Sequence, residues 1–250
     1  MTIIDRPVRM PRPAFFVAWE YLGRGTLPVV VSPDDTYMTE EYAAERTRRA
    51  TAKFAEIGLA ASDGRLSPEF RATLELLAAP ARECYSWTAF AANPSDDGAV
   101  FVATAGRDAV RLITDYRSIR LDPIQPRDLV PALVETLPDY PPSRMSPLRV
   151  PMAYLEDNGA DPLSEMSGRA DDLRHLMRAE RAAAHKIHAA TGNGAGRVHS
   201  APLTVYDLTR SGRILASTGP GADGGAEATV CSGTHANLVA ALNRTFETLG

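Results

Sequence analysis

The chain has 250 residues, a hydrophobic share of 44%, a charged share of 23% and a formal net charge of −4 at pH 7. This composition is typical of a globular protein that buries a core in one large domain or in two fused halves. The negative charge argues against nucleic acid or an anionic membrane surface as the main partner. Residues 1–10 contain no signal-peptide core, and no apolar run approaches the length of a membrane span, so we expect a cytosolic protein without membrane insertion.

The first part of the chain predicts three helices. Prolines keep residues 8–12 extended, and a first helix is expected over residues 14–22, where Gly23 stops it. Thr39 is a good N-cap for a second helix, and Gly58 is placed as its C-cap. Ser67 begins a third helix that runs to Leu77. Small and apolar residues spaced by four and three predict the buried face of the second helix: Ala43, Thr47, Ala50, Phe54 and Ile57.

Four short runs then predict β-strands. The runs are residues 83–90, 99–104, 109–114 and 118–122, and each is rich in β-branched or aromatic residues and bounded by Gly, Asn, Asp or Pro. The connections are too short for a parallel crossover, which needs a dozen or more residues. The sequence therefore predicts an up-and-down antiparallel meander in the first half of the chain.

A proline-rich connector at residues 138–150 predicts an internal boundary. Before it, a helix is expected from Pro126 or Arg127, with Leu129, Val130, Leu133 and Leu137 on one face. Two segments before the connector are similar to segments after it. Residues 128–137 match residues 237–246, and the turn at Gly106-Arg107 matches the turn at Gly212-Arg213. We expect a single α+β domain made of two similar halves, about 1–137 and 151–250, each a helix, a four-stranded antiparallel meander and a helix.

The expected repeat also decides an ambiguous stretch of the second half. A short helical piece is expected over residues 152–157 and a longer helix from Pro162 to about Glu180. Residues 181–191 are rich in alanine and have the propensity to extend that helix. Their counterpart in the first half is a hairpin, so we predict paired strands at residues 185–190 and 197–206, joined by a glycine-rich loop at residues 192–196.

No motif in the sequence predicts chemistry. His185 and His188 have no third ligand close in sequence, and on a strand they point to opposite faces, so no metal site is expected. The segment 231–235 has only one of the glycines that a nucleophile elbow needs, and it is better interpreted as the N-cap of a helix. Cys84 and Cys231 are expected to be buried free thiols. We therefore expect no catalytic residues, no cofactor and no metal.

Several segments resemble a known family. Residues 22–28 read Leu-Gly-Arg-Gly-Thr-Leu-Pro and are similar to its Leu-Gly-x-Gly-x-Leu-Pro segment, and a helix with Glu45-Arg46 that ends in Ile57-Gly58-Leu59 follows. In the second half, Asp207 followed by Gly212-Arg213 resembles its Asp-x-x-x-Gly-Arg turn. This is the EspG family of type VII (ESX) secretion-associated proteins of actinobacteria. The resemblance covers almost the whole chain and implies a pseudo-twofold fold with a central antiparallel sheet and flanking helical bundles.

The resemblance implies a cytosolic, non-catalytic chaperone. Its client would be a PE–PPE-like dimer or another helical type VII secretion substrate, kept soluble until export. The resemblance implies contact with the client through the loop between the first two meander strands and through the second half of the chain. The residues expected there are Asn93, Ser95, Asp96 and Asp97 in the loop, and Thr229 and His235 in the second half.

Two alternatives stay open at this point. One is a small-molecule hydrolase of unknown substrate, and the other is a structural subunit of the secretion apparatus. The sequence also leaves open whether the protein is a monomer or a homodimer.

Overall fold

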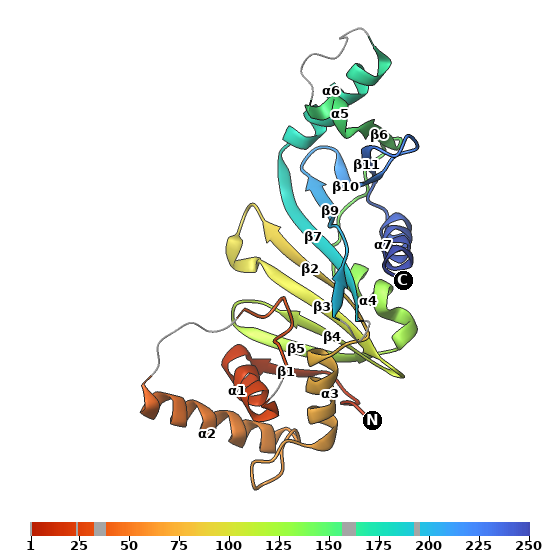
Figure 1. Ribbon diagram of the computed structural model, residues 1–250. Helices are drawn as coiled ribbons and strands as arrows, with labels where there is room; N and C mark the ends of the chain where they lie inside the picture. Colours follow the sequence, from red (N-terminus) through yellow and green to blue (C-terminus); the bar gives the residue numbers. More distant parts are fainter. Residues whose placement is uncertain (1, 24, 33–38, 157–163, 193–195) are drawn as a thin grey trace. The chain divides into compact units, whose positions relative to one another are not determined.

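The computed structural model describes residues 2–23, 25–32, 39–156, 164–192 and 196–250 (Figure 1). Arg24, Asp157, Pro162 and the centre of the loop at residues 192–196, which the sequence predictions include, lie outside the described residues. The chain divides into two compact units. The first consists of Met1–Trp87, Asp97–Thr136 and Ala190–Val198, and the second of Thr88–Asp96, Leu137–Ala189 and His199–Gly250.

The first unit starts with β1 (Val8–Pro11), α1 (Arg12–Leu22), α2 (Glu40–Glu56) and α3 (Pro68–Ala78). Thr39 and Ser67 cap α2 and α3, each accepting a hydrogen bond from a backbone N–H in the first turn. At the end of α2, Gly58 adopts a φ of +76°, and the N–H of Leu59 turns back to the carbonyl of Phe54. The caps at Thr39, Gly58 and Ser67 are the ones that the sequence predicts, whereas α1 begins two residues before the predicted start and α3 ends one residue after the predicted end.

The predicted meander is confirmed. It consists of β2 (Arg82–Phe90), β3 (Gly98–Ala105), β4 (Asp108–Thr114) and β5 (Ser118–Ile124), and the strand order in this unit is β1-β5-β4-β3-β2. The β3–β4, β4–β5 and β1–β5 pairs are all antiparallel. The turn between β3 and β4 contains Gly106, whose φ of +61° lies in the left-handed region that favours glycine.

The core of the first unit is built from the helices α1, α2 and α3 and one face of these strands. Phe15, Phe54, Phe70 and Phe101 are all less than 2% exposed, and each joins the same cluster of apolar side chains. Full burial of one such side chain contributes about 2 kcal/mol. Phe54 and Ala50 are the buried residues of α2, and both belong to the face that the periodicity of the sequence predicts to be buried.

The helix predicted after the meander is shorter than expected. Residues 126–128 form a 3₁₀ turn (η2, Pro126–Asp128), and α4 extends only over Leu129–Val134. Leu137, which was expected on the helical face, is buried but lies beyond the helix. Pro131 lies in the first turn of α4, where a missing N–H costs little, and its ring disfavours an α-helix that continues back through residues 126–128. The carbonyl of Leu129 accepts a hydrogen bond from the buried thiol of Cys84, which fixes α4 on β2.

The first unit also buries a carboxylate that the sequence analysis did not single out. Glu83 of β2 is 1% exposed, and neither carboxylate oxygen has a hydrogen-bond partner among the described residues. The nearest cation is Arg197, whose Nη1 lies 3.3 Å from Oε2 of Glu83. Burial raises the pKa of Glu83 from 4.5 to about 7, and the charge of Arg197 offsets only part of that effect.

We expect Glu83→Gln to stabilise the protein at alkaline pH and to change little in acid. The folded state holds the Glu83 proton more tightly than the unfolded state, so this stabilisation is present below pH 4.5 and is lost as the pH rises through about 7. The glutamine stays neutral throughout. Its unfolding free energy should exceed that of the wild type by about 3 kcal/mol more at pH 8.5 than at pH 4.5. Urea denaturation at both pH values measures this, and a pH-independent difference would contradict it.

The second unit contains one antiparallel sheet with the strand order β7-β9-β10-β11-β6. The strands are β6 (Leu148–Pro151), β7 (Arg181–Gly192), β9 (Leu203–Leu208), β10 (Gly212–Pro220) and β11 (Ala226–Ser232). The helices are α5 (Met152–Glu156), α6 (Glu165–Arg178) and α7 (His235–Leu249). The part of β2 that follows Trp87 and the part of β7 that precedes Ala190 belong to this unit.

The ambiguous alanine-rich stretch is a strand, as predicted. The middle of β7 alternates, with His185 and Ile187 buried on one side and Lys186 exposed on the other, and residues 189–191 are all buried. The partner strand differs from the prediction, because residues 197–206 are divided into β8 (Arg197–His199) and β9. Pro202 lies in the interruption, and a proline has no N–H to donate to a neighbouring strand.

The α+β class, with a large antiparallel sheet and flanking helices, is confirmed. The internal repeat stays a prediction, which superposition of residues 128–137 on residues 237–246 will test. Gly106 and Gly212 each have a positive φ in a turn between two strands, as the repeat expects. Among the described residues, none of the helices combines the length and the apolar character that crossing a membrane requires.

Candidate partner-binding site

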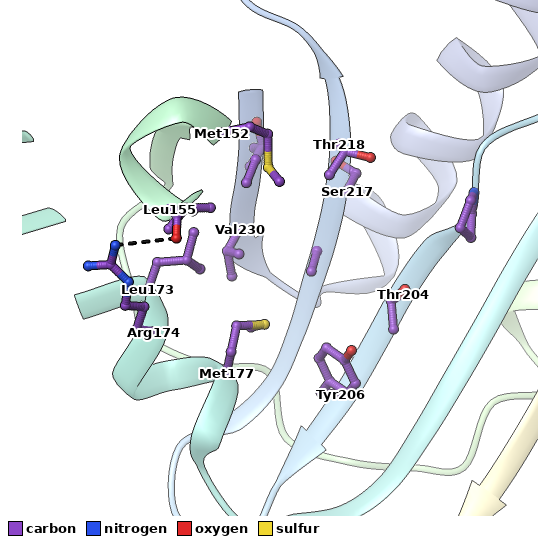
Figure 2. Close-up of a pocket in the computed structure, with 14 residues that line it drawn as sticks. Met152, Leu155, Leu173, Arg174, Met177, Thr204, Tyr206, Ser217, Thr218 and Val230 are labelled. Atoms are coloured by element: carbon purple, nitrogen blue, oxygen red, sulfur yellow. Dashed lines mark hydrogen bonds between the residues drawn. The ribbon is translucent and has the colours of Figure 1, made fainter. Parts of the chain in front are cut away.

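An open apolar groove lies in the second unit between α5, α6 and the sheet (Figure 2). It has a volume of about 420 Å³. Helix side chains form one wall, and side chains from β9, β10 and β11 form the floor. The lining residues that matter most to its chemistry are Met152, Leu155, Met177, Tyr206, Ala216 and Val230.

The floor of the groove follows from the register of the sheet. Tyr206 of β9 pairs with Ile214 of β10, and Ala216 pairs with Val230 of β11, so these residues share one face. Val230 is 2% exposed and belongs to the apolar cluster of this unit, whereas Tyr206 and Ala216 stay half-buried. The groove is therefore an apolar surface that the chain covers only in part.

A single arginine holds the helical wall in place. Arg174 of α6 donates from Nη2 to the carbonyl of Tyr154 at 2.6 Å and to that of Leu155 at 3.4 Å, as the dashed line in Figure 2 indicates for the second bond. Those carbonyls lie in the last turn of α5, where helical partners are missing. The guanidinium also pairs with Asp171 at 2.7 Å. Arg174 thus positions the side chains of α5 over the floor.

Two of the wall residues are methionines, Met152 and Met177, and both are half-buried. Methionine is unbranched and polarisable, so it adapts to ligands of different shape. A groove with a methionine-rich wall and few polar groups suits the apolar side chains of a protein partner better than a small polar substrate.

The loop expected to bind the partner is ordered around Asn93. It contains the 3₁₀ turn η1 (Pro94–Asp96) between β2 and β3. The side chain of Asn93 accepts from the hydroxyl of Ser95 at 2.7 Å and donates to Asp96 at 3.0 Å. Asn93, Ser95 and Asp96 are exposed, and Asp97 is half-buried. These contacts make the loop a preformed polar surface.

The loop and the groove are connected through the first residues of β7. The backbone N–H of Ala91, at the start of the loop, donates to the carbonyl of Ala182 at 3.0 Å. The adjacent Arg181 lies 4.0 Å from the centre of the Tyr206 ring and donates to the carbonyl of Met177 at 2.6 Å. One arginine therefore contacts two groove residues next to the anchor of the loop.

The two site residues expected in the second half occupy different places. Thr229 of β11 lies at the edge of the groove. His235 is the exposed first residue of α7 and is not among the residues that line the groove. Its helix begins as the sequence predicts, since the hydroxyl of Thr234 accepts from the N–H of Asn237 at 3.1 Å. The N-cap interpretation of residues 231–235 is confirmed.

Cys231 differs from the prediction because it is only half-buried, whereas Cys84 is buried. Burial still raises the pKa of the Cys231 thiol, and the charge of Arg244 offsets that only in part. A thiol that is hard to ionise is a poor nucleophile. Within the described part of the chain, no three His, Cys, Asp or Glu side chains come close enough to hold a metal ion.

Among the residues that the structure describes, a buried polar network of His185, Asp207, Arg213 and Thr88 resembles a hydrolase triad. Nδ1 of His185 lies 2.9 Å from the hydroxyl of Thr88, and Nε2 lies 3.1 Å from Asp207. Arg213 donates to both oxygens of Asp207 at 2.6 and 2.8 Å. Burial by itself raises the pKa of Asp207, but the hydrogen bonds from Arg213 and His185 outweigh it and hold that pKa below its usual value. Asp207 is therefore ionised, and Nε2 of His185 donates to it.

The network lies outside the groove, and its histidine is fully buried. His185 is 0% exposed, and neither His185 nor Thr88 lines the groove, whereas a nucleophile and its base need a cavity in which a reacting atom fits. The charge of Asp207 is balanced by Arg213, which also donates to the carbonyl of Pro138 at 2.7 Å. These contacts fix strands and connector together, and they favour a structural role over catalysis.

The same network explains the Asp-x-x-x-Gly-Arg resemblance. Gly212 has a φ of +81°, and a Cβ there would lie 2.7 Å from the carbonyl oxygen of Pro141. Only glycine lets the connector approach this closely, and the N–H and carbonyl of Arg213 then bond to Pro141 and Ser143. Asp207 and Arg213 supply the ion pair, so the Asp, Gly and Arg of this turn together hold the connector against the sheet, although four residues separate Asp207 from Gly212 in this chain.

The fold and the groove together define an α+β protein that leaves an apolar sheet face partly open beside two helices. A sequence profile of the EspG family matches residues 11–244, so the chain belongs to the EspG family. A solved structure of similar fold is that of the Mycobacterium tuberculosis type VII secretion system chaperone EspG5 in complex with the PE25–PPE41 dimer. The TM-score is 0.73 at 16% identity, over 98% of this chain and 97% of that one. Comparison with curated proteins gives no match.

Sequence reasoning missed most of the groove. Its walls come from segments that are distant in the chain, and Met152, Met177 and Tyr206 carry no motif. One signal was present, since Leu173, Leu176 and Met177 recur at helical spacing on α6 and so predict an apolar face. That pattern gives no indication that the face stays partly uncovered.

Proposed function

We propose that this chain is a non-catalytic chaperone that binds a helical type VII secretion substrate of the PE–PPE kind in the cytoplasm before export. The observation that carries the proposal is the apolar groove of the second unit, in a chain that belongs to the EspG family and shares its fold with EspG5. EspG5 is described as a chaperone and is bound to a PE–PPE dimer in its structure.

The groove supplies what such a function requires. A secreted helical protein with an exposed apolar tip aggregates unless that surface is covered, and an apolar groove of about 420 Å³ covers side chains of that kind. A few buried apolar anchors usually carry most of the affinity of an interface, while a polar rim sets orientation. In this proposal, Met177, Leu155 and Tyr206 contact the anchors, and the loop at residues 93–97 forms part of the rim.

Co-expression tests the proposed function directly. A PE–PPE pair from the source organism, with PE25–PPE41 as a second probe, is produced with and without this chain. We expect the pair to remain in the supernatant and to elute with the chain in size-exclusion chromatography only when both are present. If the pair elutes alone and its solubility does not depend on the chain, the proposed function is wrong.

The loop has its own prediction. Replacing Ser95-Asp96-Asp97 by Gly-Ser-Gly removes the polar side chains that Asn93 organises, and it removes no fully buried group. We expect the fold to be retained and the affinity for the PE–PPE pair to fall by about tenfold, since rim contacts mainly set orientation and specificity. Isothermal titration calorimetry measures the affinity, with circular dichroism as the folding control. Unchanged affinity would limit the site to the groove.

A further inference from the structure

A lysine without an ionic partner borders the groove. Lys186 of β7 pairs in register with Thr204, which lines the groove, so both residues lie on the same face of the sheet. Lys186 is exposed, while its neighbours His185 and Ile187 are buried on the opposite face. In the described ranges of the chain, no Asp or Glu lies within ion-pair distance of it.

The arginine that lines the groove and the arginine that lies over Tyr206 are already engaged. Arg174 pairs with Asp171 and donates to carbonyls of α5, and Arg181 lies over Tyr206 and donates to Met177. Lys53 is the one other lysine of the sequence, and it pairs with Glu56 at 2.7 Å on α2. Arg174, Arg181 and Lys53 thus have partners within the chain, whereas the three N–H donors of the Lys186 ammonium group can bind a group outside the chain.

We propose that the partner segment bound in the groove carries an acidic side chain beside its apolar anchors, and that this carboxylate pairs with Lys186. The inference rests on the proposed function and adds the chemistry of the partner to it. The apolar floor takes the anchors, and Lys186, one strand away from Thr204, attracts the carboxylate at the rim. A rim ion pair of this kind speeds association and rejects partners of the wrong charge.

Two synthetic amphipathic peptides are the probes. They share one leucine face, and one carries glutamate and the other lysine at every position that flanks that face. Fluorescence anisotropy at low ionic strength should give the full chain an affinity for the glutamate peptide about fivefold above that for the lysine peptide. Lys186→Glu should reverse that order. The preference should fade at high salt, where exposed charges are screened.

Lys53→Glu is the matched control, because it changes the net charge by the same amount at a site in the other unit. We expect it to leave the preference of the wild type unchanged. Carbodiimide cross-linking of the glutamate peptide, followed by mass spectrometry, should join its carboxylates to Lys186 in preference to Lys53.

Three outcomes would count against the inference, and they are distinguishable. Equal binding of both peptides by the wild type and by Lys186→Glu would overturn the role of Lys186 and leave the proposed function intact. Cross-linking to Lys53 in place of Lys186 would do the same. Binding of neither peptide would overturn the groove as a docking site, and the inference with it.

Discussion

Replacement of Asp207 by alanine is expected to lower the free energy of unfolding by about 4 kcal/mol, because it leaves Arg213 buried without its counter-ion. The side chains of the pair are 8% and 1% exposed, and two hydrogen bonds of 2.6 and 2.8 Å join them. His185 loses its acceptor at the same time. Urea denaturation at pH 7, followed by circular dichroism, measures the change.

Asp63→Ala is the matched control for this prediction. Asp63 also contacts an arginine, Arg65, at 2.7 Å, but that pair is 48% and 85% exposed. Water and salt screen an exposed ion pair, so the control should lose far less stability than Asp207→Ala. The double variant Asp207→Ala with Arg213→Ala should lose less than the sum of the two single variants, since it leaves no unpaired charge. Equal losses for Asp207→Ala and Asp63→Ala would contradict a structural role for the network.

Local chemistry explains why much of the fold is predictable from the sequence. Thr39, Ser67 and Thr234 are caps that act on their own first turns, and Gly58 and Gly106 act within a few residues of themselves. The strands of the meander are predictable because their connections are too short for any other arrangement. β7 is the exception, since its alanines favour a helix and only the repeat argument predicts a strand.

The remaining features depend on contacts between residues that are far apart in sequence. The partner of Glu83 is Arg197, and the partner of Asp207 is His185 as well as Arg213. No pattern of spacing relates Glu83 to Arg197, because tertiary structure alone brings them together. The groove is unpredictable for a further reason: amphipathic patterns indicate which faces are apolar, but not which of them the chain leaves partly open.

A single charge on the wall of the groove is expected to abolish most binding of the client. Met177 lies in the last turn of α6, half-buried beside Tyr206, and its carbonyl is held by Arg181. Met177→Asp would place a carboxylate where the proposal puts an apolar anchor of the PE–PPE pair. Loss of one such hot-spot contact costs about 2 kcal/mol or more, which corresponds to a drop in affinity of about 30-fold. Isothermal titration calorimetry with the co-purified pair measures it.

Met166→Asp separates this effect from damage to the helix. Met166 belongs to the same helix, is also half-buried and does not line the groove. Both variants introduce the same charge, but the helix dipole favours an aspartate in the first turn, at Met166, and disfavours one in the last turn, at Met177, by about 0.3–1 kcal/mol each. Thermal melting of both variants measures this effect separately from binding. We expect Met166→Asp to bind the client within about twofold of the wild type, because it removes no contact at the interface. If both variants bind as the wild type does while remaining folded, the client does not bind in this groove, and the loop at residues 93–97 together with the α7 face at His235 becomes the site to test.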